Sequence, residues 1–246
     1  MELWGITDCG KKRKDNEDVF RILNDDENDV AVITVCDGIG GARAGQIASS
    51  IAADVFVKQI SSFLESSSEP SEIANKMIEA VYIANRTVYL KSKENVEFYG
   101  MGTTLTAVVS TIEGEVVVNV GDSRAYHITD RTIKQITKDH TIVEEMVLRG
   151  DLTRNEARRH PKKNLITRAL GTNSEEIPDI FLLNLKPGEY ILLCTDGLSD
   201  IINDNEFLQI MQQRLGVRKS CERFIEMALT RGAPDNVTAV LFRKSF

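Results

Sequence analysis

Cysteine, histidine and proline are scarce in this chain of 246 residues, which has four, three and five of them, respectively. No two cysteines form a Cys-x-x-Cys pair, and Cys36 and Cys194 lie inside apolar runs, which is typical of free, buried thiols in a reducing compartment. The histidines are scattered rather than spaced like metal ligands. These scarcities argue against a disulfide framework and against a zinc site built from Cys and His.

The chain also lacks a basic excess and long apolar runs. Its formal net charge is −7 and its pI is about 5.2, whereas nucleic-acid-binding domains are usually basic. No apolar run reaches the roughly 18 residues of a membrane span, and the first residues lack the basic-then-apolar order of a signal peptide. We therefore expect a cytoplasmic protein with no nucleic-acid partner and no membrane partner.

Three catalytic signatures are missing from the sequence, namely Gly-x-x-x-x-Gly-Lys-Ser/Thr, Gly-x-Ser-x-Gly and His-Glu-x-x-His. P-loop nucleotide hydrolases, serine hydrolases with a nucleophile elbow and zincin proteases are therefore unsupported. Hydrophobic residues make up 42% of the chain and charged residues 27%, which is ordinary for a soluble globular protein. The length suits one large domain with a substantial core.

The apolar patterns predict an α+β protein. Helices are predicted in sequential pairs and strands in hairpins, which favours antiparallel sheets with helices outside them. The polar stretch 139–169 is predicted to be helical, to have few core anchors and to lie on the surface. It includes a short helix that begins at a Thr153–Glu156 capping box. The predicted strands are residues 3–8, 18–23, 30–36, 105–112, 115–120, 125–128, 132–136, 189–195 and 237–242, and the main predicted helices are residues 44–63, 71–88, 205–215 and 219–231.

One short run combines a buried strand, a sharp turn and a helix. Residues 30–36 are mostly apolar and β-branched, which predicts a strand. Asp37 and Gly38 follow it, and apolar residues then recur at helical spacing from 44 to 63. Asp-Gly is also a hairpin signal, but the helix that follows favours a functional Asp37 over a turn former.

Four further aspartates lie at the ends of apolar strands. Each alone is best explained as a helix cap, a turn former or a surface charge. Five together, several beside glycine, are harder to explain in that way, because clustered carboxylates repel one another unless a cation neutralises them. The four are Asp18, Asp122, Asp196 and Asp235.

Carboxylate oxygens suit a hard divalent cation, Mg²⁺ or Mn²⁺. A bridging carboxylate allows two such ions to lie about 3.5–4 Å apart and to hold a water for in-line attack on phosphorus. Arg13, which precedes Asp18 in a basic loop, is the candidate for bidentate binding of the phosphoryl group. Taken alone, Arg13 would be interpreted as a solvated surface charge.

Eight short motifs occur in one order along nearly the whole chain. They cover residues 7–18, 35–41, 100–104, 120–124, 137–140, 165–171, 195–198 and 235–238. Each is weak alone, but the ordered set closely resembles the metal-dependent protein serine/threonine phosphatases of the phosphatase-2C (PPM) type, particularly the compact bacterial members. The resemblance implies a sandwich of two antiparallel β-sheets flanked by helices on both outer faces. It also implies that residues 1–246 are a single catalytic domain, with a mobile flap at about residues 140–170.

The resemblance further implies a set of cation ligands. Asp37 would bridge two Mn²⁺ or Mg²⁺ ions, and the backbone carbonyl of Gly38 would bind one of them. Asp196 and Asp235 would bind the other ion. Asp18 would act largely through a metal-bound water.

The remaining implied roles concern a third site and the phosphate. Asp122, together with Asp196, would match the third, weaker metal site of bacterial members, and Arg13 would match the phosphate-binding arginine. The chain departs from the common bacterial pattern at Ile39, Ala42 and Gln46. Ile39 stands where some eukaryotic members have a histidine proposed as general acid, so leaving-group protonation is expected to fall to metal-bound water.

The implied activity is hydrolysis of phosphoserine and phosphothreonine in proteins by direct attack of a metal-activated bridging water, with Asp37, Asp196 and Arg13 as catalytic residues. The implied partners are phosphorylated proteins, together with a serine/threonine kinase and its substrates.

Two alternative functions stay open. A silent phosphoprotein-binding regulator of the same fold would have lost metal ligands, and none is lost. A metal-dependent nuclease or nucleotide hydrolase would use similar ligands, but the acidic pI and the lack of a basic, aromatic groove weigh against it.

Overall fold

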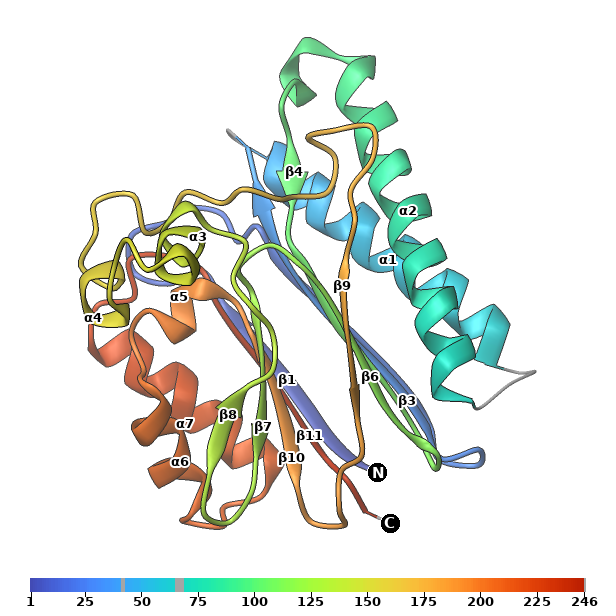
Figure 1. Ribbon diagram of the computed structural model, residues 1–246, viewed down its shortest axis with the longest axis vertical. Coiled ribbons are helices and arrows are strands. Elements are labelled where there is room, and N and C mark those ends of the chain that lie inside the picture. The colour runs from blue at the N-terminus through green and yellow to red at the C-terminus, as the bar shows by residue number, and fades with distance from the viewer. Residues whose placement is uncertain (41–42, 65–68, 246) are drawn as a thin grey trace.

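The computed structural model describes residues 1–40, 43–64 and 69–245. Two antiparallel sheets face each other and helices cover both outer faces, which confirms the predicted fold class (Figure 1). The strands are β1 (Glu2–Asp8), β2 (Asp18–Asp25), β3 (Val30–Ile39), β4 (Gly102–Thr103), β5 (Leu105–Thr111), β6 (Gly114–Val120), β7 (Arg124–Ile128), β8 (Ile133–Gln135), β9 (Asp179–Leu183), β10 (Tyr190–Cys194) and β11 (Val237–Arg243). The helices are α1 (Ala44–Leu64), α2 (Pro70–Glu94), α3 (Ile142–Arg149), α4 (Arg154–Ala157), α5 (Asp196–Ser199), α6 (Asp204–Met211) and α7 (Val217–Thr230), with a 3₁₀ turn at Val96–Phe98.

The two sheets have similar sizes and consist of neighbouring antiparallel strands. The first sheet has the order β1-β11-β10-β7-β8, and the second has the order β2-β3-β5-β6-β9 with β4 paired to β3. Successive side chains of a strand point to opposite faces. On β3, Ala31, Ile33 and Val35 accordingly pack between the sheets, whereas Val32 and Cys36 pack against the helices. Because both faces of β3 are buried, its sequence is an almost continuous apolar run.

Each outer face is covered by a pair of helices. Helices α1 and α2 pack on the second sheet, and α6 and α7 pack on the first (Figure 1). On the first sheet, Phe207 of α6 and Phe224 of α7 meet edge to face, with ring centroids 5.1 Å apart. Helix α1 is long and apolar enough for a membrane span by composition alone, but Phe56 and Ile60 are fully buried against the sheet.

The structure contains two strands that the apolar patterns did not predict, β4 and β9. Strand β9 lies at an edge of the second sheet, where Leu182 remains 60% exposed, so it shows neither a continuous apolar run nor a clean alternation. Strand β4 has only two residues, and α3 lies within the stretch expected to be a surface excursion. Helix α6 ends at Met211, earlier than predicted. The capping box between Thr153 and Glu156 is present at the start of α4 and confirms that prediction.

Residues 140–170, called the flap segment below, contain α3 and α4. They lie at one end of the sandwich, and both chain termini lie at the other end (Figure 1). Bridges Thr141–Ile166 and Thr103–Leu170 fasten the base of the flap segment. Val143 and Ala157 are its buried apolar side chains between residues 142 and 168, which agrees with the expected scarcity of core anchors.

Candidate metal centre

Strand alternation brings two of the predicted carboxylates together. Asp18 and Asp37 are directly opposite each other in the β2–β3 ladder. Asp37 continues the series of inward side chains that includes Val35, and Asp18 continues the series that includes Phe20. Both carboxylates therefore face the space between the sheets, at the end of the sandwich that carries the flap segment.

Asp18 is the more deeply buried of the two, with 4% of its surface exposed. Its Oδ2 accepts hydrogen bonds from Thr195 Oγ1 at 2.8 Å and from Thr238 Oγ1 at 2.6 Å. Its Oδ1 is buried, and no hydrogen bond from the described residues reaches it. Burial raises the pKa of Asp18 to about 7, although the two threonine hydroxyls oppose the rise. Asp18 thus offers one free oxygen to a ligand inside the protein.

Two glycines allow the loops that carry the other carboxylates to approach closely. A Cβ on Gly38 would lie 2.3 Å from the carbonyl oxygen of Gly45 in α1. A Cβ on Gly197 would lie 2.0 Å from the carbonyl oxygen of Asn236. No real side chain tolerates such distances, so glycine is required where α1 and α5 begin beside the site.

The backbone of Asp37 is held from both sides by the motif at 100–104. Its N–H donates to Thr104 Oγ1 at 2.9 Å. Its carbonyl oxygen accepts from the Thr104 N–H and from Thr103 Oγ1, both at 2.9 Å. Sequence reasoning recognised this motif but gave it no role. The structure shows that it fixes the orientation of Asp37.

A pocket of ≈ 240 Å³ is lined by the predicted site residues other than Asp18, which lies opposite Asp37 in the β2–β3 ladder. The predicted residues that line it are Arg13, Asp37, Gly38, Asp122, Asp196 and Asp235. A larger depression of ≈ 620 Å³, at the other ends of β1, β10 and β11, contains none of them. The five carboxylates and the arginine that the sequence singled out therefore converge on one place.

Burial and charge repulsion inside the pocket shift the pKa values of three carboxyl groups upward. Burial, followed by the neighbouring carboxylates, raises the pKa of Asp37 and of Asp122 well above the ordinary value. Burial and the charges of Asp200 and Asp235 raise the pKa of Asp196 to about 6, and its side chain is hydrogen-bonded to that of Asp37. Asp37 and Asp196 remain partly exposed to the pocket, so a cation entering the pocket reaches both.

The donor set fits a hard divalent cation. All the candidate ligands are oxygens, one of them a buried carboxylate oxygen without a hydrogen bond. Burial raises the pKa values of Asp18, Asp37, Asp122 and Asp196, so protons compete with a cation for these carboxylates. Within the described part of the chain, no three His, Cys, Asp or Glu side chains are already drawn together as a ligand cage. The carboxylates are therefore neighbours that a cation would draw together.

Arg13 lies at the rim of the pocket with its side chain half exposed. Its Nη2 donates to Asp235 Oδ2 at 2.9 Å, and its Nη1 is 3.9 Å from Glu17 Oε2. Asn236 holds the loop that carries Arg13, because its amide donates to the Asp15 carbonyl oxygen at 3.0 Å and accepts from the Glu17 N–H at 2.9 Å. Asn236 is a positioning residue that sequence reasoning missed.

Besides Ile39, five further residues line the pocket without having been predicted as site residues. They are Glu17, Gly40, Thr104, Asn164 and Ile166. All but Asn164 lie inside recognised motifs, so their motif membership was the available signal, whereas Asn164 carried none. Asn164 and Ile166 belong to the flap segment, which therefore forms part of the pocket wall.

The departures from the common bacterial pattern have different positions. Ile39 lines the pocket. Gln46 is exposed on α1 and is not among the described lining residues, and Ala42 lies outside the residues that the structure describes. None of the described residues that line the pocket is a histidine.

A family model described as protein phosphatase 2C matches residues 7–240. The chain belongs to the protein phosphatase 2C family. The serine/threonine phosphatase stp of Listeria monocytogenes is 32% identical over 241 residues, which cover 97% of this chain and 94% of that protein. PstP of Mycobacterium tuberculosis is 35% identical over 235 residues, which cover 96% of this chain and 43% of that longer protein.

Solved structures of family members share the fold. Stp1 from Staphylococcus aureus superposes with a TM-score of 0.91 at 34% identity, covering 100% of this chain and 96% of that one. The catalytic domain of PstP, described as a complex with 2 manganese ions, has a TM-score of 0.82 at 33% identity, covering 97% and 96%. As a phosphatase-2C member, the chain is a metal-dependent protein serine/threonine phosphatase, and nothing favours the silent regulator.

Proposed function

We propose that the pocket holds two Mn²⁺ or Mg²⁺ ions for the hydrolysis of phosphoserine and phosphothreonine, and a third ion more weakly. Asp37 and the carbonyl oxygen of Gly38 serve one ion, and Asp37, Asp196 and Asp235 serve the second. Asp122 and Asp196 serve the third. The observation that carries this proposal is the convergence of the carboxylates on one pocket, where burial and mutual repulsion raise the pKa values of several of them.

When bound, the cations neutralise phosphoryl charge and lower the pKa of the attacking water. Residues of the chain hold the candidate ligands and the phosphate-binding arginine in position. Thr103 and Thr104 fix the backbone of Asp37. Two threonine hydroxyls hold Oδ2 of Asp18 and leave its Oδ1 without a hydrogen bond, so Oδ1 would be available to water in the cation site. Asp235 holds the Arg13 guanidinium at the pocket rim, where its fork can bind two phosphoryl oxygens.

We further propose that residues 1–246 act as a single catalytic domain in the cytoplasm, on proteins phosphorylated by a serine/threonine kinase. The core between the two sheets contains side chains from both ends of the chain, Leu3 and Phe242 among them, and β1 pairs with β11, which supports one domain. Three of the four cysteines are buried and all four are free, which suits a reducing compartment. The net charge of −7 supports the absence of a nucleic-acid partner.

The test compares wild type with Asp37→Ala and Asp196→Ala on a phosphothreonine peptide, with Mn²⁺, Mg²⁺ or EDTA. Asp54→Ala is the matched control, because Asp54 is an exposed carboxylate on α1 that pairs with Arg21. We expect EDTA and either pocket variant to lower the rate by about 10³-fold or more, and the control to match wild type. Titration calorimetry with Mn²⁺ should show loss of high-affinity binding in the same two variants.

Two outcomes would overturn the assignment. Full peptide hydrolysis by Asp37→Ala and Asp196→Ala would remove these residues from the site. Hydrolysis of nucleic acid without hydrolysis of the phosphopeptide would replace the proposed substrate.

A further inference from the structure

The motif at residues 137–140, called the cradle segment below, has no role in the chemistry proposed above. It runs beside the loop that carries Asp122, between β6 and β7, and leads into the flap segment. Asp122 lines the pocket, and its carboxylate can act only where this short loop places it. The contacts that hold the loop therefore decide the position of Asp122.

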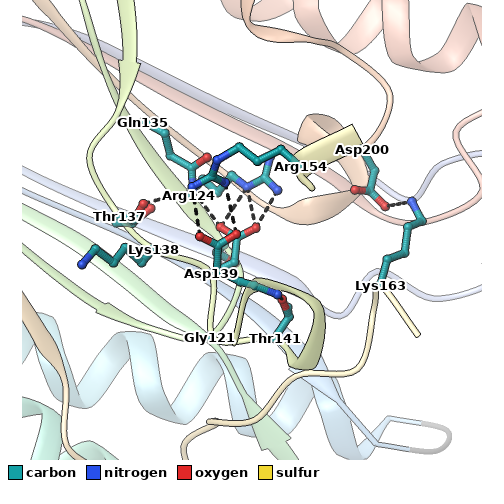
Figure 2. Close-up of polar contacts among 12 residues, drawn as sticks. Gly121, Arg124, Gln135, Thr137, Lys138, Asp139, Thr141, Arg154, Lys163 and Asp200 are labelled. Atoms are coloured by element: carbon teal, nitrogen blue, oxygen red, sulfur yellow. Dashed lines mark hydrogen bonds and ion pairs between the residues drawn. The ribbon is translucent and has the colours of Figure 1, made fainter. Parts of the chain in front are cut away.

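The cradle segment contacts the loop on both sides of Asp122. Before it, the Gly121 N–H donates to His140 Nδ1 at 3.1 Å, and the Gly121 carbonyl oxygen accepts from the His140 N–H at 3.0 Å. After it, Arg124 donates to both carboxylate oxygens of Asp139 at 2.6–3.0 Å. Figure 2 shows Asp139 facing the Arg124 guanidinium, with Gly121 below them.

Two more hydrogen bonds complete the attachment. The Ala125 N–H donates to Thr137 Oγ1 at 3.1 Å, and the Asn119 amide donates to the Lys138 carbonyl oxygen at 3.2 Å. In Figure 2 the Lys138 side chain points away from Arg124 and Asp139. The cradle segment thus contacts the loop through its backbone and through three of its four side chains.

His140 also joins the loop to the flap segment. Its carbonyl oxygen accepts from the Thr167 N–H at 2.7 Å, at the returning end of the flap segment. Its ring is buried, and because a backbone N–H can only donate, Nδ1 accepts and the ring proton lies on Nε2. Both Asp179 Oδ2 and Arg168 Nη1 lie 3.3 Å from Nε2, and of these two only the Asp179 carboxylate can accept the ring proton. Burial lowers the pKa of His140, in agreement with a neutral ring.

We infer that His140 and Asp139 are positioning residues that set the third cation site at Asp122 and hold the flap segment, whose Asn164 and Ile166 line the same pocket. The inference rests on the proposed role of Asp122 as a ligand. Groups that orient a metal ligand from outside the ligand shell commonly change metal affinity by about 10–100-fold. His140 is the more informative residue, because its two ring nitrogens contact different parts of the protein.

Two substitutions separate the contacts of the ring. The side-chain oxygen of asparagine is separated from Cα by the same number of bonds as Nδ1 of histidine. In His140→Asn the Gly121 N–H therefore keeps an acceptor, whereas the contact with Asp179 is lost because the side chain is shorter. In His140→Gln, the amide reaches towards Asp179, and the buried Gly121 N–H loses its partner. Ser110→Ala is the control, because it removes one buried hydrogen bond, to Glu115, near the opposite end of the sheet.

The experiment measures Mn²⁺ binding by titration calorimetry, alongside phosphopeptide hydrolysis as a function of Mn²⁺ concentration. We expect His140→Gln to weaken only the weakest Mn²⁺ site, by about 10–100-fold, and to raise the Mn²⁺ concentration for half-maximal activity. His140→Asn should keep that affinity within about threefold of wild type, and Ser110→Ala should match wild type. Thermal unfolding of each variant verifies that it is folded.

Asp122→Ala separates the ligand role of Asp122 from the positioning role of His140. If Asp122→Ala does not remove the weak site, the ligand assignment in the proposed function is wrong. If Asp122→Ala removes the site but His140→Gln leaves it intact, or if His140→Asn and His140→Gln weaken it equally, the positioning role of the Nδ1 contact is refuted.

Discussion

The raised pKa of Asp18 predicts an unusual pH dependence for the cation-free protein. Burial moves this pKa from 3.8 to about 7. Between these values the folded state keeps a proton that the unfolded chain has released, so the free energy of unfolding falls as the pH rises. At about 1.4 kcal/mol per pKa unit, the full shift corresponds to about 4 kcal/mol. The stabilising proton is present at low pH and is lost as the pH rises to about 7.

The substitution Asp18→Asn removes the titrating group and keeps an oxygen that can accept from the hydroxyls of Thr195 and Thr238. Urea unfolding in EDTA, followed by circular dichroism, gives the free energy of unfolding at each pH. Between pH 5 and pH 8 we expect this free energy to fall by about 2–3 kcal/mol more for wild type than for the variant. Asp130→Asn, an exposed position beside Arg214, should follow wild type. With Mn²⁺, the wild-type slope should reverse, because ligand carboxylates bind the cation deprotonated.

Parallel stability curves for wild type and Asp18→Asn in EDTA would refute this reasoning, because they would mean that Asp18 has no raised pKa. An unchanged wild-type slope in saturating Mn²⁺ would show that the cation does not displace carboxyl protons.

Three more predictions concern the arginine at the pocket rim, the close contact made by a glycine beside the pocket, and a buried ion pair. Arg13→Lys keeps the charge but loses the bidentate fork, so the KM for a phosphopeptide should rise about 3–10-fold, as measured by steady-state kinetics. Gly197→Ala places a Cβ 2.0 Å from the Asn236 carbonyl oxygen, and calorimetry should show Mn²⁺ affinity reduced by about tenfold or more. Lys244 is 2.8 Å from the fully buried Glu115, so Lys244→Met should lower the free energy of unfolding by about 3–5 kcal/mol, and adding Glu115→Leu should restore most of it.

The layers of the fold were predictable because strands and helices differ in apolar period. Strand β3 has an unbroken run between two cores, and α2 has apolar residues on one face, so both were predicted with little ambiguity. Strand β9 was missed because an edge strand gains its stability from backbone pairing with β6 and buries few side chains. The end of α6 was misplaced because the apolar pattern continues to Leu215, although that residue is 37% exposed.

The site was predictable at the level of ligands and not at the level of their support. Each aspartate follows or opens an apolar strand, so its position was visible in the chain. The contacts of Asn236 with the loop of Arg13, and of His140 with Gly121, join residues that are distant in sequence and have no periodic pattern. His140 was taken for one of several scattered histidines, because burial and ring orientation are properties of the folded chain.

The pairing of β1 with β11 has a consequence for chain connectivity. Glu2 lies opposite Arg243 in that ladder, so the chain enters and leaves at neighbouring points on the end of the sandwich remote from the pocket (Figure 1). A segment attached after β11 would begin beside β1, at the end of the sandwich remote from the pocket, and would leave the pocket mouth open. Its effect on dephosphorylation would come through tethering, by raising the local concentration of a bound substrate. Joining the two ends and opening the chain at an exposed loop should likewise preserve the pocket.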